Sequence, residues 1–443
     1  MRAALSIVTV LVVGTTASSQ PVVERLTGPQ HTSDYWLTSG SHHFFGAVIP
    51  DGRVFALRHD RDASDLFTNI VFNVDGTAEP VATNAPAGFV IRTASEDGRW
   101  IGGAVQFQYG PDQCVPSSLI GGSTSRHLRY DAFRETFEFL TDLCPTFTSI
   151  AMSIDGGELL GTHLRGDWPH QYIDGDPVRE FGDAAIWRDG AVELLDLPVF
   201  PTMAPEDFYS HARDISADER IIVGNALLND REGPPPPFGE AILWRDGAPE
   251  LLPHFQDDSA DHQTSFVYSV SSDGSAMIGD TASFRQEPDE SWLLERRTTW
   301  ISRDGVLTEI PLPDQNHRVS WLTEGGALVV GNDFANGYDF SGIVWTDARG
   351  LERADVYLAS LGVDLGGQPV RFIVDMTRDG RWMLAALGVD DDHEQFARIR
   401  IPCSPANLTA DRAIALDDLS GDGLLDLADI VAFLTLYADG CSG

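Results

Sequence analysis

Two short patterns of alternating apolar and polar residues recur along most of this chain. The first reads AAIWRDGAVELL at 184–195 and returns as EAILWRDGAPELL at 240–252. Two alternating segments joined by Arg-Asp-Gly predict a β-hairpin, because Asp-Gly favours a tight turn. Looser copies of this first hairpin lie at 70–81, 127–140, 298–310 and 342–354.

The second pattern precedes each copy of the first and follows the template S/T-x-D-G-x-x-x-x-G. It reads ISADERIIVG at 215–224 and VSSDGSAMIG at 270–279. This is a second hairpin, in which glycine supplies the positive φ that the turn requires. Glu219 replaces the turn glycine in one copy, and Ala385 replaces the final glycine in another. The turn position falls at Gly52, Gly98, Gly156, Glu219, Gly274, Gly326 and Gly380.

The spacing of these turns indicates the fold. Successive turn positions are 46 to 63 residues apart, and each interval holds two hairpins. A four-stranded unit repeated about every 55 residues, with almost no helical periodicity, is typical of a β-propeller blade. The pattern predicts an all-β protein in which residues 20–401 form a β-propeller of about seven four-stranded blades. The repeat leaves a count between six and eight open.

The last unit lacks one strand. The pattern stops after EQFARIRI at 394–401, whereas VVERL at 22–26, close to the N-terminus, resembles the AVELL strand of the intact copies. Adding VVERL to the last blade would close the ring and remove two exposed sheet edges. The alternative is an unpaired N-terminal segment.

Together the two hairpin patterns resemble a known family. The alternation of S-x-D-G-x-x-x-x-G with A-x-x-W-x-x-G over residues 40–401 is similar to the HAF-type repeats of bacterial extracellular proteins, and 350–388 looks like their closing unit. The resemblance implies a propeller architecture. It implies no reaction.

The two faces of such a ring differ. The turns within the hairpins are short and share one face, whereas the long connections at 104–126, 162–183, 225–240, 280–297, 332–341 and 386–393 share the other. Aromatic side chains in these connections are candidates for contact with a ligand. The alternative is that they pack locally beneath the loops. The candidates are Tyr109, Trp168, Tyr172, Trp292 and Tyr338.

The N-terminus predicts export. Residues 1–19 combine Arg2, an apolar run at 3–13 and small residues suited to cleavage near Ala17 or Ser19, the layout of a signal peptide. The alternative is a buried strand. An extracellular, periplasmic or cell-surface location permits disulfides. Local spacing favours two pairs, although other pairings stay open. The pairs are Cys114 with Cys144, and Cys403 with Cys441.

Charge narrows the list of partners. The 30 Lys and Arg residues are all Arg, and the formal net charge is −37. A surface this acidic repels phosphate backbones, which argues against nucleic acid as a partner. No segment after the signal peptide has the length and apolar character of a transmembrane anchor.

The segment 402–443 carries the most explicit chemical motif. DLSGDGLLDLAD at 418–429 places oxygen ligands at the spacing of an EF-hand-type Ca²⁺ loop, with Gly423 at the sharp bend. An apolar helical face follows at 430–437. The alternative is an ordinary acidic turn. The predicted ligands of one Ca²⁺ ion are Asp418, Ser420, Asp422, the Leu424 carbonyl, Asp426 and Asp429.

This loop and helix, bracketed by cysteines, resemble a dockerin repeat. A full dockerin carries two loops, but 407–418 has Arg412 in place of glycine and Ala415 in place of a ligand. The resemblance implies attachment to a protein partner such as a cohesin or to a cell surface. The single intact loop puts cohesin binding in question.

Two functions fit these features. One is an exported, non-enzymatic binding or scaffold propeller that binds a protein or polysaccharide and is anchored by its Ca²⁺-dependent tail. The other is a polysaccharide-active hydrolase or lyase with the same tail. The sequence contains no motif of a serine hydrolase, zinc protease or phosphate-binding loop, and it nominates no catalytic residue. A buried group of carboxylates with Arg or His at the ring centre favours the enzyme.

Overall fold

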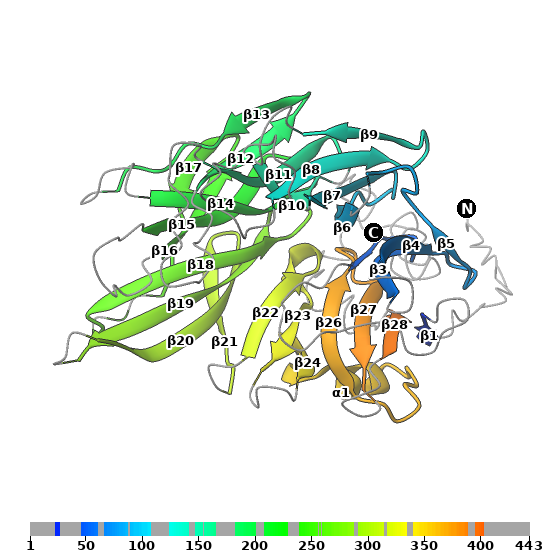
Figure 1. Ribbon diagram of the computed structural model, residues 1–443. Coiled ribbons are helices and arrows are strands. Elements are labelled where there is room, and N and C mark those ends of the chain that lie inside the picture. The colour runs from blue at the N-terminus through cyan, green and yellow to red at the C-terminus, as the bar shows by residue number, and fades with distance from the viewer. Residues whose placement is uncertain are drawn as a thin grey trace, which may run out of the picture.

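The protein is a seven-bladed β-propeller. The computed structural model describes residues 23–26, 46–60, 66–86, 89–107, 124–140, 147–153, 155–164, 182–200, 208–228, 239–255, 257, 259–287, 291–313, 317–334, 340–388 and 395–402. Over these residues the strands form seven four-stranded antiparallel sheets that follow one another around a ring (Figure 1). The all-β prediction is confirmed, and the blade count is seven.

The first four blades comprise strands β2 to β17. Their bounds are, for blade 1, β2 Gly46–Val48, β3 Val54–Asp60, β4 Leu66–Phe72 and β5 Ala78–Pro80; for blade 2, β6 Phe89–Ala94, β7 Trp100–Phe107, β8 Thr124–Asp131 and β9 Thr136–Phe139; for blade 3, β10 Phe147–Met152, β11 Glu158–Leu164, β12 Gly182–Arg188 and β13 Ala191–Leu194; and for blade 4, β14 Phe208–Ile215, β15 Ile221–Leu228, β16 Gly239–Arg245 and β17 Ala248–Leu251.

The remaining blades comprise β18 to β28 and β1. Their bounds are, for blade 5, β18 His262–Val270, β19 Ala276–Gln286, β20 Trp292–Arg303 and β21 Val306–Ile310; for blade 6, β22 His317–Leu322, β23 Val329–Asp333, β24 Ser341–Thr346 and β25 Gly350–Arg353; and for blade 7, β26 Val370–Met376, β27 Trp382–Leu387, β28 Gln395–Arg400 and β1 Val23–Arg25. A 3₁₀ turn, η2 (Glu324–Gly326), and a helix, α1 (Ala354–Ser360), complete the described elements.

The N-terminal strand closes the ring, as predicted. Strand β1 pairs antiparallel with β28, with Val23 opposite Ile399, and the Leu26 amide donates to the Phe396 carbonyl at 3.0 Å. Arg398, whose side chain is fully buried, forms an ion pair with Glu24. Blade 7 is therefore built from both ends of the propeller segment, which leaves no unpaired edge where the chain meets itself.

The S/T-x-D-G motif makes the turn between the first two strands of a blade. In blade 2 the Ser95 hydroxyl donates to Asp97 at 2.6 Å, and Asp97 accepts the Arg99 amide at 2.9 Å. The Ser95 hydroxyl also accepts the Trp100 amide at 2.9 Å. All seven predicted turn positions have positive φ, including Glu219 at 62°. The motif repeated most often in this chain is thus a structural turn.

The final glycine of the template lies where two strands are unusually close. A Cβ atom on Gly331 would lie 1.9 Å from the Arg318 carbonyl oxygen, and one on Gly279 would lie 2.0 Å from that of Phe266. Both glycines face a residue next to a one-residue register shift in the first strand of the blade. The bulge brings the backbones together, and only glycine fits there without a shift.

The core lies between successive blades. The tryptophan of the A-x-x-W pattern is fully buried in blades 3, 4 and 5 (Trp187, Trp244 and Trp300). Each apolar cluster draws residues from two neighbouring sheets, as between blades 3 and 4. No blade can bury its faces alone, so the repeat is stable only as a ring.

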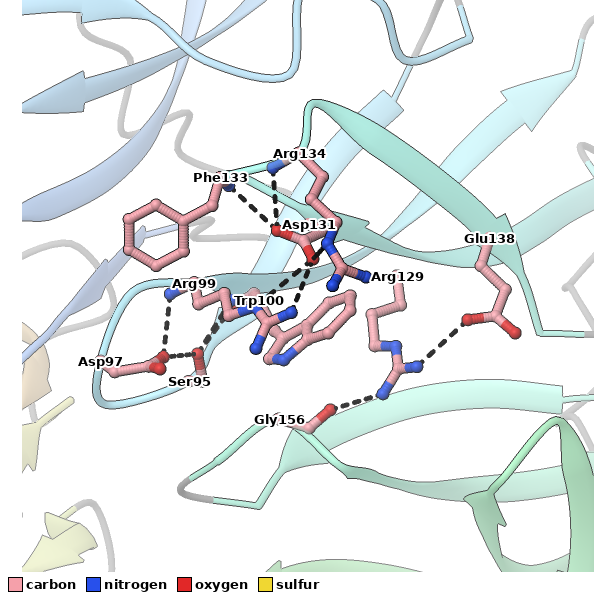
Figure 2. A network of polar contacts seen from close by, with 10 residues as sticks. All are labelled: Ser95, Asp97, Arg99, Trp100, Arg129, Asp131, Phe133, Arg134, Glu138 and Gly156. Atoms are coloured by element: carbon pink, nitrogen blue, oxygen red, sulfur yellow. Dashed lines mark hydrogen bonds and ion pairs between the residues drawn. The ribbon is translucent and has the colours of Figure 1, made fainter.

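Arginine side chains also connect neighbouring blades. Figure 2 shows Arg129 of blade 2, whose guanidinium donates to the Gly156 carbonyl of blade 3 at 2.8 Å and to Glu138 at 3.1 Å. The same guanidinium lies 4.1 Å from the ring centroid of Trp100 and 4.5 Å from that of Trp187. It therefore joins two blades through a carbonyl and two aromatic faces.

Two regions differ from the sequence-based expectation. The sequence predicts a long connection at 280–297, but most of these residues extend β19 and β20, which project as a ribbon from blade 5 (Figure 1). Helix α1 interrupts an otherwise all-β pattern between blades 6 and 7, where Tyr357 and Leu358 are buried. No helix among the described residues has the length and apolar character needed to span a membrane.

Several predictions fall outside the described residues. They concern the signal peptide at 1–19 and the tail at 403–443, with its six proposed Ca²⁺ ligands. The four cysteines Cys114, Cys144, Cys403 and Cys441 also lie there, so their pairing remains a prediction.

Candidate functional site

The axis of the ring is lined by the first strand of each blade. These strands, β2, β6, β10, β14, β18, β22 and β26, gather at the centre of the ring (Figure 1). Six of them carry a register shift at the same place in the repeat, which leaves one residue there without a ladder partner, and β26 has a second shift near its start. Such bulges redirect side chains, and here they lie beside the central channel of the propeller.

Arg378 spans the channel at the face formed by the short turns. It belongs to the turn of blade 7, where it takes the variable place in Thr-Arg-Asp-Gly. Its guanidinium donates to Asp214 at 2.8 Å and to the Ile215 carbonyl at 2.6 Å, both in blade 4. Its Nε atom lies 3.9 Å from Glu96 of blade 2. One side chain therefore links three blades across the axis.

Two aspartates at equivalent positions each fasten their own inner strand to that of the next blade, β14 to β18 and β26 to β2. Asp214 accepts hydrogen bonds from the Ser269 hydroxyl at 2.7 Å and the Val270 amide at 3.0 Å. Asp375 accepts the Val48 amide at 2.9 Å. Their carboxylates bind backbone and side-chain donors of the following blade, so they serve as structural acceptors in the ring.

Burial strongly perturbs Asp375. Its side chain is half-buried, and the surrounding protein removes enough water to raise the pKa of this carboxyl from 3.8 to about 7. The nearby Asp214 also raises the pKa, while the Val48 amide and Arg378 lower it. Burial dominates because it penalises the charged form.

We expect Asp375→Asn to change how stability depends on pH. A folded-state pKa raised to about 7 stabilises the wild type most below pH ~4, and this contribution is lost as the pH rises through about 7. The substituted side-chain amide would keep an oxygen for the Val48 amide and would not ionise. Chemical denaturation should find the variant about 4 kcal/mol more stable than the wild type at pH 8, with little difference at pH 4.

The exposed Asp304 offers a matched control for this measurement. It lies in a surface turn of blade 5, so Asp304→Asn makes the same change of side chain away from the inner strands. A variant at Asp375 that followed the wild-type profile from pH 4 to pH 8 would contradict the assigned role of burial.

A second polar group lies in blade 5, on strands β18, β19 and β20. The Tyr268 hydroxyl donates to Asp280 at 2.9 Å, and the Thr299 hydroxyl donates to the same carboxylate at 2.5 Å. Arg297 lies 3.4 Å from Asp280, which is only 1% exposed. Asp280 is thus enclosed by donors and by one guanidinium.

Two further arginines beside this group form no direct ion pair with a carboxylate among the described residues, although the charge of Arg318 lowers the pKa of Asp280. Arg213 is the bulge residue of β14, next to the equivalent Tyr268 of β18. It is exposed, yet burial by surrounding protein is the main influence on its guanidinium and lowers its pKa. As the bulge residue of an inner strand, Arg213 belongs to the wall of the channel. Arg318 of β22 lies over the Phe334 ring, 5.8 Å from its centroid.

His211 completes the wall on the side of blade 3. Its Nδ1 atom lies 2.6 Å from the Thr162 hydroxyl. Burial, aided by the charge of Arg213, lowers the pKa of His211 to about 4, so its imidazole is neutral at pH 7. No group of three metal-ligating side chains occurs among the described residues.

Only one of the residues proposed from the sequence for a ligand face is among the described residues. Tyr109, Trp168, Tyr172 and Tyr338 are outside the described residues. Trp292 is described, and its ring packs against that of His262 within blade 5, with centroids 5.9 Å apart. Trp292 therefore has a local packing partner, and its contact with a ligand remains a prediction.

Sequence reasoning missed the channel residues. Asp214 and Asp375 each precede the Ser or Thr of the turn template by two positions, where the other repeats have no acid. This departure from the repeat could have identified Asp214 and Asp375 as candidate channel residues. Arg213 and Tyr268 gave none, because a bulge cannot be located from alternation alone.

Comparison with known proteins supports the fold alone. No protein-family model matches the chain, and no curated protein does. Among solved structures, it is similar to an oligogalacturonate lyase from Vibrio parahaemolyticus, with a TM-score of 0.50 and 13% identity over 87% of this chain and 95% of that one. It is also similar to the β-propeller domain of the Trilobed protease from Pyrococcus furiosus, with a TM-score of 0.48 and 13% identity over 80% and 95%.

Proposed function

We propose that this chain is an exported binding propeller without a catalytic role, attached to a partner or surface by a Ca²⁺-dependent tail. The observation that carries the proposal is the state of the channel carboxylates. Asp214 already accepts bonds from Arg378 and from blade 5, and Asp375 accepts the Val48 amide. General acid–base catalysis needs carboxyl groups that can reach a substrate.

The alternative remains a polysaccharide-active enzyme. It draws support from the presence of carboxylates and Arg378 at the ring centre, which was the expected mark of such an enzyme. The carboxylates of this cluster, however, hold blades together. The resemblance to a lyase in the comparison is one of fold and brings no residue of that enzyme to this chain.

A depolymerisation assay tests the absence of catalysis. The full chain, without its signal peptide, is incubated with a panel of neutral and acidic polysaccharides, and new reducing or unsaturated ends are measured. We expect no release above buffer. Sustained release by the wild type that Asp375→Asn or Asp214→Asn abolishes, while the control Asp304→Asn does not, would overturn the proposal.

The tail is tested with Ca²⁺ alone. In DLSGDGLLDLAD, three aspartates at loop positions 1, 5 and 12 repel one another without a cation. Calorimetry on the full chain should detect about one Ca²⁺ site, with Mg²⁺ substituting poorly because it demands tighter geometry. Asp422→Ala should abolish binding.

A matched control comes from the degenerate copy of the loop. Asp411 occupies the same loop position in 407–418 as Asp422 does in 418–429. Asp411→Ala should leave Ca²⁺ binding unchanged. Two sites of similar affinity would mean that 407–418 also binds, and no heat of binding would remove the support for Ca²⁺-dependent attachment.

A further inference from the structure

We propose that the central channel binds a small carboxylate-bearing ligand, held by Arg213 and Arg318 on either side of Tyr268. This inference rests on the proposed binding function and specifies the chemical class of its ligand. The three residues come from β14, β18 and β22, the inner strands of three successive blades.

The channel wall around Arg213 and Arg318 is positively charged, whereas the chain as a whole is strongly negative. The protein carries a formal net charge of −37, and typical described arginines have an acid within reach, as in Arg220 with Asp246 at 2.7 Å. Neither Arg213 nor Arg318 forms a direct ion pair with an acid among the described residues, although the charge of Arg318 also acts on Asp280 and lowers its pKa. Asp280 is occupied by Arg297, Tyr268 and Thr299. The wall therefore keeps unneutralised positive charge, which attracts an anion.

The wall is rigid before any ligand arrives. The Asn225 side chain bridges β15 to the next blade by accepting the Val267 amide at 2.9 Å and donating to the Val267 carbonyl at 3.3 Å. Asn332 does the same for Ile373, at 2.8 and 3.0 Å. The first bridge fastens the blade of Arg213 to the blade of Tyr268, and the second fastens the blade of Arg318 to blade 7. Binding therefore orders side chains and leaves the backbone unchanged, which reduces its entropic cost.

The chemistry favours a carboxylate over other anions. A guanidinium presents paired donors that match the two oxygens of a carboxylate or phosphate. The strongly acidic surroundings oppose a dianion more than a monoanion, because the repulsion scales with ligand charge. Beside Arg318, the rings of Phe334, Phe340 and Phe372 lie with centroids 5.4 to 6.3 Å apart. They offer apolar surface to the remainder of the ligand.

Benzoate and benzamide are suitable probes, since they share a shape and differ in charge. Ligand-observed NMR on the full chain at low salt should show benzoate binding and at least tenfold weaker binding of benzamide. Benzoate affinity should fall as salt rises. Inorganic phosphate should compete more weakly than benzoate itself. Arg213→Gln and Arg318→Gln should each weaken benzoate binding about tenfold, the loss typical of one charge-assisted contact.

The control variant is Arg296→Gln. Arg296 is exposed on blade 5 and pairs with Glu309 at 3.2 Å, so its loss should leave benzoate affinity unchanged. Equal melting curves for the three variants would show that they remain folded. The proposed site would be overturned if benzamide bound as tightly as benzoate, or if phosphate bound more tightly. It would also be overturned if neither channel variant altered benzoate binding, or if benzoate did not bind at millimolar concentration.

These outcomes separate the site from the proposed function. If the protein cleaved polysaccharide and also bound benzoate in an Arg213-dependent way, the proposal of a non-catalytic role would be rejected. The proposal of a carboxylate site would stand. If benzoate did not bind, while Ca²⁺ bound normally and no polysaccharide was cleaved, the carboxylate site would be rejected. The proposal of a tethered, non-catalytic propeller would then stand.

Discussion

Deleting residues 20–27 should lower the melting temperature of the propeller by about 5 °C or more. The deletion removes β1, exposes the edge of β28 and takes Leu26, 6% exposed, out of the core. It also leaves the buried Arg398 without Glu24. At about 2 cal/mol/K per residue, a ring of this size loses roughly 1–2 °C for each kcal/mol, and an apolar side chain with a buried ion pair amounts to several kcal/mol.

The reference for this measurement is a chain that begins at residue 20. It lacks the proposed signal peptide but keeps the strand. The deleted form should also associate at high concentration, because an open sheet edge pairs with other chains. Identical melting curves for the two chains would show that β1 adds nothing to the closed ring.

Arg378→Met should destabilise the fold by about 3–5 kcal/mol, as expected when one partner of a largely buried ion pair is removed. Asp214 would lose its only guanidinium among the described residues, and burial already raises the pKa of Glu96. The side chains of Arg378 and Asp214 are 20% and 15% exposed, so solvent screens the loss only in part. Denaturant unfolding with a fixed m-value measures the difference.

Two further variants test the cause of this effect. Arg296→Met removes an exposed pair with Glu309 and should cost less than about 1 kcal/mol. Combining Arg378→Met with Asp214→Asn should recover part of the loss, because the neutral partner no longer leaves a charge unpaired. If Arg378→Met cost no more than Arg296→Met, the bridge across the axis would have no energetic role.

The repeating hairpins could be predicted because their determinants are local. Alternating polarity, the Asp-Gly turns and the period of the template all act within one blade, and the structure places positive φ at every predicted turn position. Closure by VVERL followed from the same pattern, since the last unit lacked one strand and the N-terminus supplied a matching one. The prediction of a connection at 280–297 was wrong because Asp280 to Gln286 and Trp292 to Arg297 continue strands beyond the repeat.

The channel could not be predicted because its contacts cross the ring. Arg378 and Asp214 are 164 residues apart, and nothing in either local pattern relates blade 7 to blade 4. The bulges that place Arg213 and Tyr268 beside each other depend on strand register, which a single sequence does not specify. The tail shows the reverse case, since its Ca²⁺ ligands are close in sequence and the motif alone nominates them.

By itself, then, the sequence determined the blade, the approximate number of repeats and the strand that closes the ring, because each depends on residues within one hairpin or on simple periodicity. Only the tertiary structure decided which residues face the axis and which of their charges are already paired. Those properties arise only when the seven blades come together. The free energy of each charged side chain at the axis depends on partners in other blades, which only ring closure brings within 4 Å.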